Sequence, residues 1–177
     1  MLPILLALAF IAILFIVVIA GQPDEFKVIR SVKISAPTEK IFPHVNDLHK
    51  WEAWSPWAKL DSNAKSSFDG AAAGVGAAMS WDGNKKIGAG KMIITESRPG
   101  ELIRIRLEFI RPFQATNTAE FTFKPDGNQT LVTWNMTGQS NCFFKAFGLF
   151  MNCDKMVGGD FEKGLAAMKL VAESAQS

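Results

Sequence analysis

The sequence is poor in the residue types that form metal sites and nucleophilic catalytic sites. Its 177 residues include 2 cysteines and 2 histidines. Cys142 and Cys153 have neither a C-x-x-C spacing nor the four-ligand count of structural zinc, and on one helix they would lie about 16 Å apart, so we interpret them as buried thiols. His44 and His49 have no third ligand nearby, and we interpret both as solvated or capping residues. The sequence therefore predicts no metal ion, no cofactor and no nucleophilic mechanism.

A long basic tract is also missing. Lysine and arginine total 19 against 17 aspartates and glutamates, and no block of them is long enough to follow a phosphate backbone. We therefore expect no nucleic-acid partner. The triplets Gly74-Val75-Gly76 and Gly88-Ala89-Gly90 do not open a helix, as a nucleotide-binding loop requires, and we interpret them as bends in strands.

The longest apolar run lies at the N-terminus. Leu2 to Ala20 carry no charged side chain, and these nineteen residues would span roughly 29 Å as a helix, close to the thickness of the hydrocarbon core of a bilayer. We interpret residues 1–21 as the membrane anchor of a single-pass protein, with the membrane as a partner. A cleaved signal peptide is the alternative, because Val18 and Ala20 are small residues at the spacing that signal peptidase accepts.

A short polar linker, residues 22–25, separates this segment from the domain that we expect over residues 26–177. The location of that domain relative to the membrane is poorly determined by the charges. A weak preference for the cytoplasmic side comes from Lys27, Arg30 and Lys33.

Residues 26–177 show the periodicities of one α+β domain. Alternation predicts a first strand, two short helices follow between Pro37 and Trp51, and turn signals beyond Lys65 separate six further strands. A final helix after Val157 carries an apolar stripe at spacings of three and four residues. Because no helix separates the later strands, we expect a curved antiparallel sheet of about seven strands wrapped around the C-terminal helix. The pattern does not decide whether side chains fill the space between them or leave a cavity.

The strand from Leu102 to Ile110 is the most charged. One side of it carries Ile103, Ile105, Leu107 and Phe109, and the other carries Arg104, Arg106 and Glu108. We place the charged side in water and the apolar side on the core. In the opposite orientation, an arginine facing the cavity would pair with a ligand carboxylate.

Several short motifs, taken in order along the chain, resemble one known family. They are Ser31 to Phe42, Trp51-x-x-Trp54-Ser55-Pro56-Trp57, Glu120 to Phe123, Val132 to Met136, and Asp160 to Leu165 followed by Met168-Lys169. The pattern resembles the polyketide cyclase/dehydrase branch of the START-like (SRPBCC) superfamily over nearly all of residues 26 to 174. The resemblance implies a helix-grip fold with an apolar cavity between the sheet and the C-terminal helix. It does not imply cyclase activity, and a chain with no tyrosine lacks the phenol donor that a cyclase could use.

The candidate ligand-binding residues are large apolar side chains of the expected inner wall. Trp54 and Trp57 flank Pro56 and would either cover a pocket or seal the open end of the sheet. The full set is Trp54, Trp57, Met79, Trp81, Met92, Ile94, Phe121, Trp134, Met136, Phe161, Leu165 and Met168. These residues either line a cavity or fill an ordinary core, and the face assigned to each strand rests on parity alone.

We expect a membrane-tethered domain that binds a small hydrophobic molecule, such as a lipid or a polyketide-like or isoprenoid-like compound. One alternative is a cyclase or dehydrase, which would need a titratable group inside the cavity, such as Glu96, Glu108 or Glu120. Another alternative is a module that binds a protein partner. Its docking face would be the sheet or the cluster of Phe143, Phe144, Phe147 and Phe150. Neither the ligand nor the oligomeric state follows from the sequence.

Overall fold

The computed structural model describes residues 2–139 and 153–174. The first half of this chain contains α1 (Leu2–Ala20), β1 (Glu25–Ile34), α2 (Thr38–Asn46) and the 3-10 helix η1 (Leu48–Ala53). It continues with β2 (Lys65–Gly70), β3 (Ala77–Asp82), β4 (Ala89–Arg98), β5 (Leu102–Arg111), β6 (Ala115–Asp126), β7 (Gln129–Gln139) and α4 (Cys153–Ser174). This order of a strand, two short helices, six strands and a long helix is the order that the sequence predicts.

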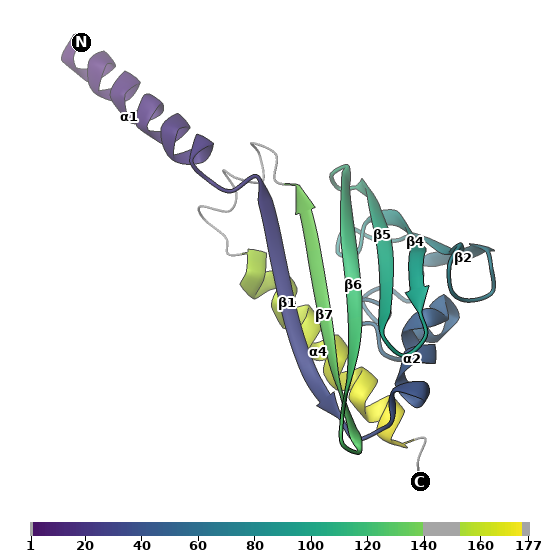
Figure 1. Ribbon diagram of the computed structural model, residues 1–177. Helices are drawn as coiled ribbons and strands as arrows, with labels where there is room; N and C mark the ends of the chain where they lie inside the picture. The colour runs from purple at the N-terminus through teal and green to yellow at the C-terminus, as the bar shows by residue number, and fades with distance from the viewer. Residues whose placement is uncertain (1, 140–152, 175–177) are drawn as a thin grey trace.

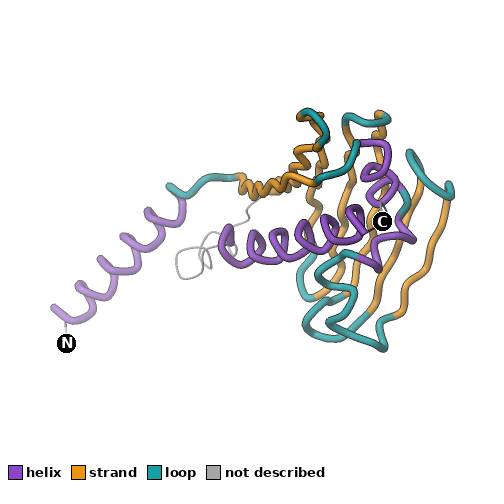
Figure 2. Tube along the Cα trace, turned by 90° about the horizontal axis from the view of Figure 1, so that it is seen from below, coloured by secondary structure: helices purple, strands orange, loops and turns teal. Residues whose placement is uncertain are grey.

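The seven strands form one antiparallel sheet in the order β1-β7-β6-β5-β4-β3-β2. Each strand from β2 to β6 pairs with the next strand in sequence, whereas β1 pairs along its whole length with β7. Tight turns make the hairpins possible. Gly127 lies in the turn between β6 and β7 and has a φ of 60°, a conformation that glycine adopts readily. The sheet curves around α4 (Figures 1 and 2). The α+β helix-grip architecture is therefore confirmed.

Helix α4 lies on the concave face of the sheet and packs mainly on β1. Its inward stripe of Phe161, Leu165, Met168 and Ala172 is buried, at the spacings of three and four residues that place side chains on one face of a helix. Each large side chain in this stripe contributes roughly 1.5–3 kcal/mol through burial. The stripe joins α4 to the hydrophobic core of the domain.

Helices α2 and η1 close one end of this core. The indole N–H of Trp51 donates to the backbone oxygen of Val45 at 3.0 Å, and that of Trp54 donates to the backbone oxygen of His44 at 2.9 Å. These two bonds tie η1 to the last turn of α2. Both tryptophan rings consequently reach the core from the connection between β1 and β2.

Helix α1 forms over Leu2–Ala20, as the sequence predicts, and projects away from the domain (Figure 1). The prediction of a single-pass membrane location is wrong, however. Within residues 2–139 and 153–174, none of the helices has the combination of length and apolar character that crossing a bilayer demands. The expected membrane partner and the weak preference for the cytoplasmic side both depended on a membrane span. Neither is therefore supported.

Candidate functional site

The twelve candidate residues lie together in one core on the concave side of the sheet. Nine of them are buried: Trp54, Met92, Ile94, Phe121, Trp134, Met136, Phe161, Leu165 and Met168. The partly buried ones are Trp57, Met79 and Trp81. The parity assigned to the strands therefore brings these side chains to the same face, while their contact with a ligand stays a prediction.

The centre of this core is an aromatic cluster, which consists of Trp51, Trp54, Trp57, Phe121, Trp134 and Phe161. Trp134 stacks on Phe161 with ring centroids 3.9 Å apart and an interplanar angle of 5°. Phe121 stacks on its neighbour Trp134 at 4.8 Å. The other three tryptophans meet Trp134 edge-on, with centroids between 5.6 and 6.3 Å away. Ring pairs in these geometries add about 0.5–1.5 kcal/mol each beyond their burial.

Gly164 allows α4 to approach this cluster closely. A Cβ atom at Gly164 would lie 3.0 Å from Pro56 Cδ and 3.0 Å from Trp134 Cζ3. The absence of a side chain there places Phe161, one turn earlier on the helix, directly on the Trp134 ring. Between α4 and β7, rings therefore fill the space in which the family resemblance implied a cavity.

A second part of the concave face lies under β3, β4 and β5, away from β1, on which α4 mainly packs. We call it the β3–β5 wall and define it as Met79, Trp81, Met92, Leu107 and Phe109. The register aligns Met79, Met92 and Leu107 in one row across the three strands. In the next row Trp81 lies over Gly90, where a Cβ would come within 2.5 Å of the indole, and meets Phe109 edge-on at 5.8 Å. Most of this wall is only partly buried, so the core reaches the surface here.

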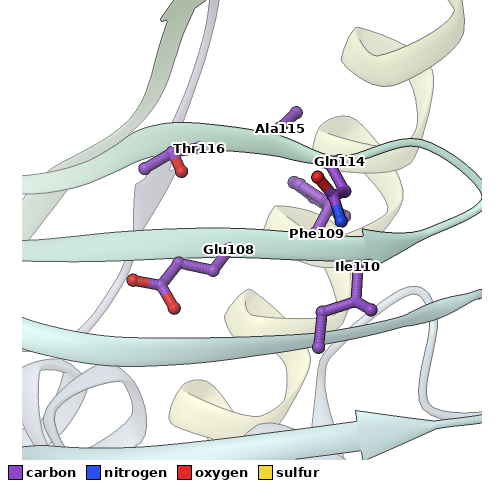
Figure 3. Close-up of a pocket in the computed structure, with 6 residues that line it drawn as sticks. All are labelled: Glu108, Phe109, Ile110, Gln114, Ala115 and Thr116. Carbon is purple, nitrogen blue, oxygen red and sulfur yellow. The ribbon is translucent and has the colours of Figure 1, made fainter.

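A pocket of about 450 Å³ lies at the end of the sheet where β5 turns into β6 (Figure 3). It is shallow and open, and its lining consists of Glu108, Phe109, Ile110, Gln114, Ala115 and Thr116. Phe109 belongs both to this pocket and to the β3–β5 wall. The sequence pattern did not predict this pocket, because its shape depends on how β5 turns into β6, and alternation does not encode the shape of a turn.

Arg30 is a charged residue of the concave face that the sequence analysis missed as a site residue. It pairs with Trp134 across β1 and β7, so it faces α4. Its Nη1 donates to Asp154 Oδ1 at 2.9 Å and its Nε donates to Glu162 Oε1 at 2.6 Å. These carboxylates raise the pKa of Arg30, and Arg30 in turn lowers the pKa of Asp154. In the alternating pattern of β1, Arg30 stands at a position where an inward apolar residue is expected. That break in the pattern was the sequence signal that could have identified it.

Asn117 is a second polar residue that the sequence analysis missed. It lies directly across from Leu107 in the pairing of β5 with β6, and it is buried. It therefore places an amide next to the β3–β5 wall. An amide is both a hydrogen-bond donor and an acceptor.

The glutamates considered for a cyclase lie on the convex face. Glu120 accepts a hydrogen bond from Arg104 Nη2 at 2.9 Å, and Glu96 bonds the Nη1 of the same guanidinium. Glu108 pairs with Arg106 at 2.8 Å. Glu108 and Glu120 alternate with core residues, and a register shift between Ile94 and Glu96 places Glu96 opposite the outward Arg104, so none of the three supplies a titratable group to the concave face. The charged side of β5 faces outward, as alternation predicts.

The histidines lie apart from this site. His44 ends α2, and burial is the main cause that lowers its pKa below the ordinary 6.5. His49 lies within η1, with its Nδ1 3.1 Å from Asp47 Oδ1 and its ring stacked on Phe68 at 3.9 Å. In the part of the chain that the structure describes, no group of three or more His, Cys, Asp or Glu residues could hold a metal ion.

Two sequence interpretations fall on other parts of the chain. The proposed docking cluster of Phe143, Phe144, Phe147 and Phe150, together with Cys142, lies outside the described residues. Cys153 begins α4, but its side chain is likewise not among those described. The partner-module alternative and the interpretation of the cysteines stay predictions.

Comparison with solved structures returns the same fold. CV1439 from Chromobacterium violaceum is 16% identical, with 86% of this chain and 99% of that chain covered and a TM-score of 0.59. MLL2253 from Mesorhizobium loti is 18% identical, with 81% and 96% covered and a TM-score of 0.57. DynU16, a protein in the dynemicin biosynthetic locus, is 13% identical, with 87% of this chain and 49% of that chain covered and a TM-score of 0.59.

No curated protein matches the chain significantly. The family described as polyketide cyclase / dehydrase and lipid transport, in contrast, matches residues 25–173, which include every strand of the sheet and nearly all of α4. This match agrees with the motifs, the topology and the apolar concave face. The chain belongs to the polyketide cyclase/dehydrase and lipid transport family, with the SRPBCC helix-grip fold.

Proposed function

We propose that the domain over residues 26–177 binds a small hydrophobic molecule on the concave face of its sheet, with residues 22–25 as the linker to α1. The observation that carries this proposal is the β3–β5 wall, a set of apolar side chains most of which are only partly buried and which is continuous with the core. Large apolar side chains that remain partly exposed in a concavity are typical of ligand sites. A lipid or a polyketide-like or isoprenoid-like compound has the apolar surface that such a wall would bury.

Flexible side chains suit this role. Met79 and Met92 are paired neighbours on β3 and β4, and methionine adapts its shape to different apolar partners. Trp54 and Trp57 border the same core and are candidates for direct contact with the ligand, as are the other members of the candidate set. Binding is favoured over catalysis because the acidic groups that a cyclase would use lie on the convex face.

The proposal is tested with a pair of substitutions on one strand. Met79→Gln places an amide on the β3–β5 wall, where its neighbours across the strands are Phe68 and Met92, whereas Ser80→Gln makes the same amide one residue away on the convex side. Because an amide that loses water without gaining a partner costs about 1–3 kcal/mol, the first variant should weaken binding by roughly fivefold or more. The second variant should bind as the unchanged protein does.

Binding is measured on the full chain with the apolar dye N-phenyl-1-naphthylamine, by the rise in its fluorescence. Lipid extraction and mass spectrometry of the purified protein would then identify a natural ligand. Equal dye binding by both variants would place the ligand elsewhere. A protein that neither takes up the dye nor carries an extractable apolar molecule would refute the proposed function.

A further inference from the structure

Strand β2 leaves one edge of the sheet open. It lies at the opposite end of the sheet from β1, and β3 is its only partner strand among the described residues (Figure 1). All six of its residues, Lys65–Gly70, are exposed. An exposed edge strand presents a row of backbone N–H and C=O groups to any chain that can pair with it.

The edge of the sheet at β1 is different. The backbone oxygen of Lys33 accepts a hydrogen bond from Lys169 Nζ at 2.8 Å, and that of Ile29 accepts one from Arg30 Nη1 at 2.7 Å. Helix α4 also packs on β1. The backbone of β2, in contrast, receives no hydrogen bond from any side chain of the described residues. We therefore take β2 as the edge that is open to a partner.

The hairpin of β2 with β3 identifies which backbone groups point outward. Ala71 N–H donates to Gly76 O at 3.3 Å, at the end of the β2–β3 ladder. Because bonded pairs recur at every second position of an antiparallel ladder, the odd-numbered residues of β2 bond β3. Ser66 and Phe68 therefore direct their N–H and C=O groups to the free edge.

Two charged side chains of β2 are placed for pairing with a copy of themselves. Lys65 and Asp69 lie on one face of the strand, at equal distances to either side of Ser67. Neither of them makes an ion pair with a described residue. Asp82, which lies opposite Lys65 on β3, is already bonded by Arg111. The opposite charge that each of these two side chains lacks is therefore present on a second β2 strand.

We propose that β2 pairs with β2 of a second copy of this chain, antiparallel and centred on Ser67, to form a symmetric dimer with one continuous sheet. Ser66 then lies opposite Phe68 of the second copy, so the outward N–H and C=O groups of these residues meet and exchange hydrogen bonds. Lys65 lies opposite Asp69 of the second copy, in a pair without backbone hydrogen bonds, where side chains approach most closely. The two-fold symmetry makes each of these contacts twice.

Other registers do not satisfy both the hydrogen bonds and the charges. A shift of one residue places outward backbone groups opposite inward ones, and a shift of two residues separates Lys65 from Asp69 of the second copy. The proposed register also covers an exposed ring. Phe68 pairs with Met79, so it lies on the concave face, and it is 41% exposed. In the dimer the concave faces of the two copies become continuous at this residue.

The test reverses the charges of the interface one at a time. Analytical ultracentrifugation of the full chain over a range of concentrations measures the molar mass and the dissociation constant of the dimer. Lys65→Glu and Asp69→Lys each turn both ionic contacts into repulsions, so each variant alone should raise the dissociation constant about tenfold or more. A mixture of the two variants should recover the dimer, because unlike chains restore opposite charges at both positions. Lys85→Glu makes the same charge change in the turn between β3 and β4 and should dimerise as the unchanged chain does.

A second variant tests the backbone pairing. Ser66→Pro removes an outward N–H that β3 does not use, and an edge strand tolerates proline at such a position. This variant should keep the circular dichroism spectrum of the fold and lose the dimer. An unchanged chain that is monomeric at every concentration would overturn the inference. A dimer that resists Lys65→Glu or Ser66→Pro would also overturn it and would assign the association to another surface. The dimer does not depend on ligand binding, so dye binding by a monomeric chain would leave the proposed function standing.

Discussion

Two of the three glycines of α4, Gly159 and Gly164, provide a direct test of how tightly the helix packs on the aromatic cluster. Among the described residues, a Cβ atom at Gly159 would meet nothing within 4 Å, whereas one at Gly164 would meet the Pro56 ring and the Trp134 ring at 3.0 Å. Gly159→Ala and Gly164→Ala are therefore the same chemical change in the same helix, made against open space in one case and against a packed core in the other.

The expected magnitudes follow from these distances. Replacing glycine by alanine inside a helix stabilises it by roughly 0.5–1 kcal/mol, and Gly159→Ala should show that gain in full. Gly164→Ala makes the same gain but forces two rigid rings apart, and overpacking of this kind costs about 1–3 kcal/mol. Because the helix propensity term is common to both variants, the difference between them isolates the packing cost at about 1–3 kcal/mol.

Urea unfolding of the full chain, followed by tryptophan fluorescence and far-ultraviolet circular dichroism, measures both free energies of unfolding. For a domain of this size, each kcal/mol should also move the melting temperature by about 2–4 °C. The slope of the transition should be the same in both variants if only the native state is affected. A Gly164→Ala protein that is stabilised as much as Gly159→Ala would contradict the close packing of α4 on Trp134.

Two further predictions concern the concave face. Trp51→Phe should cost about 1 kcal/mol more than Trp134→Phe in free energy of unfolding, because only Trp51 loses a hydrogen bond; a larger loss in Trp134→Phe, measured by denaturant titration, would refute this. Arg30 lowers the pKa of Asp154 in the folded state, so this pair stabilises the fold above the ordinary carboxyl pKa and loses its effect as pH falls through the lowered value. Arg30→Gln should flatten that part of the acid unfolding profile, and an unchanged profile would show that the pair does not contribute.

Much of the architecture was predictable because it depends on local periodicity. Ile103 and Ile105 are buried while Arg104 between them faces outward, since adjacent residues of a strand point to opposite faces. Phe161 and Leu165 face the sheet because a helix repeats every 3.6 residues. These rules act within one element, and one sequence is sufficient to apply them.

The prediction about Leu2–Ala20 shows what local composition can and cannot predict. The apolar run does form a helix, as its residues favour, but no helix of the described chain is suited to crossing a bilayer. Helix formation depends on the segment itself, whereas a location in lipid depends also on the length of the helix and on what surrounds it.

Sequence by itself determined the order of elements, the antiparallel hairpins and the set of apolar side chains that share the concave face. Tertiary structure decided what those side chains meet. Three features depend on contacts between β1, β7 and α4: the stacking of Phe161 on Trp134, the pairing of Arg30 with carboxylates of α4, and the indole N–H of Trp134, which has no partner among the described residues. Some of these contacts join residues more than a hundred positions apart in the sequence. Alternation places a residue on a face, but only packing decides whether its polar atom finds a partner.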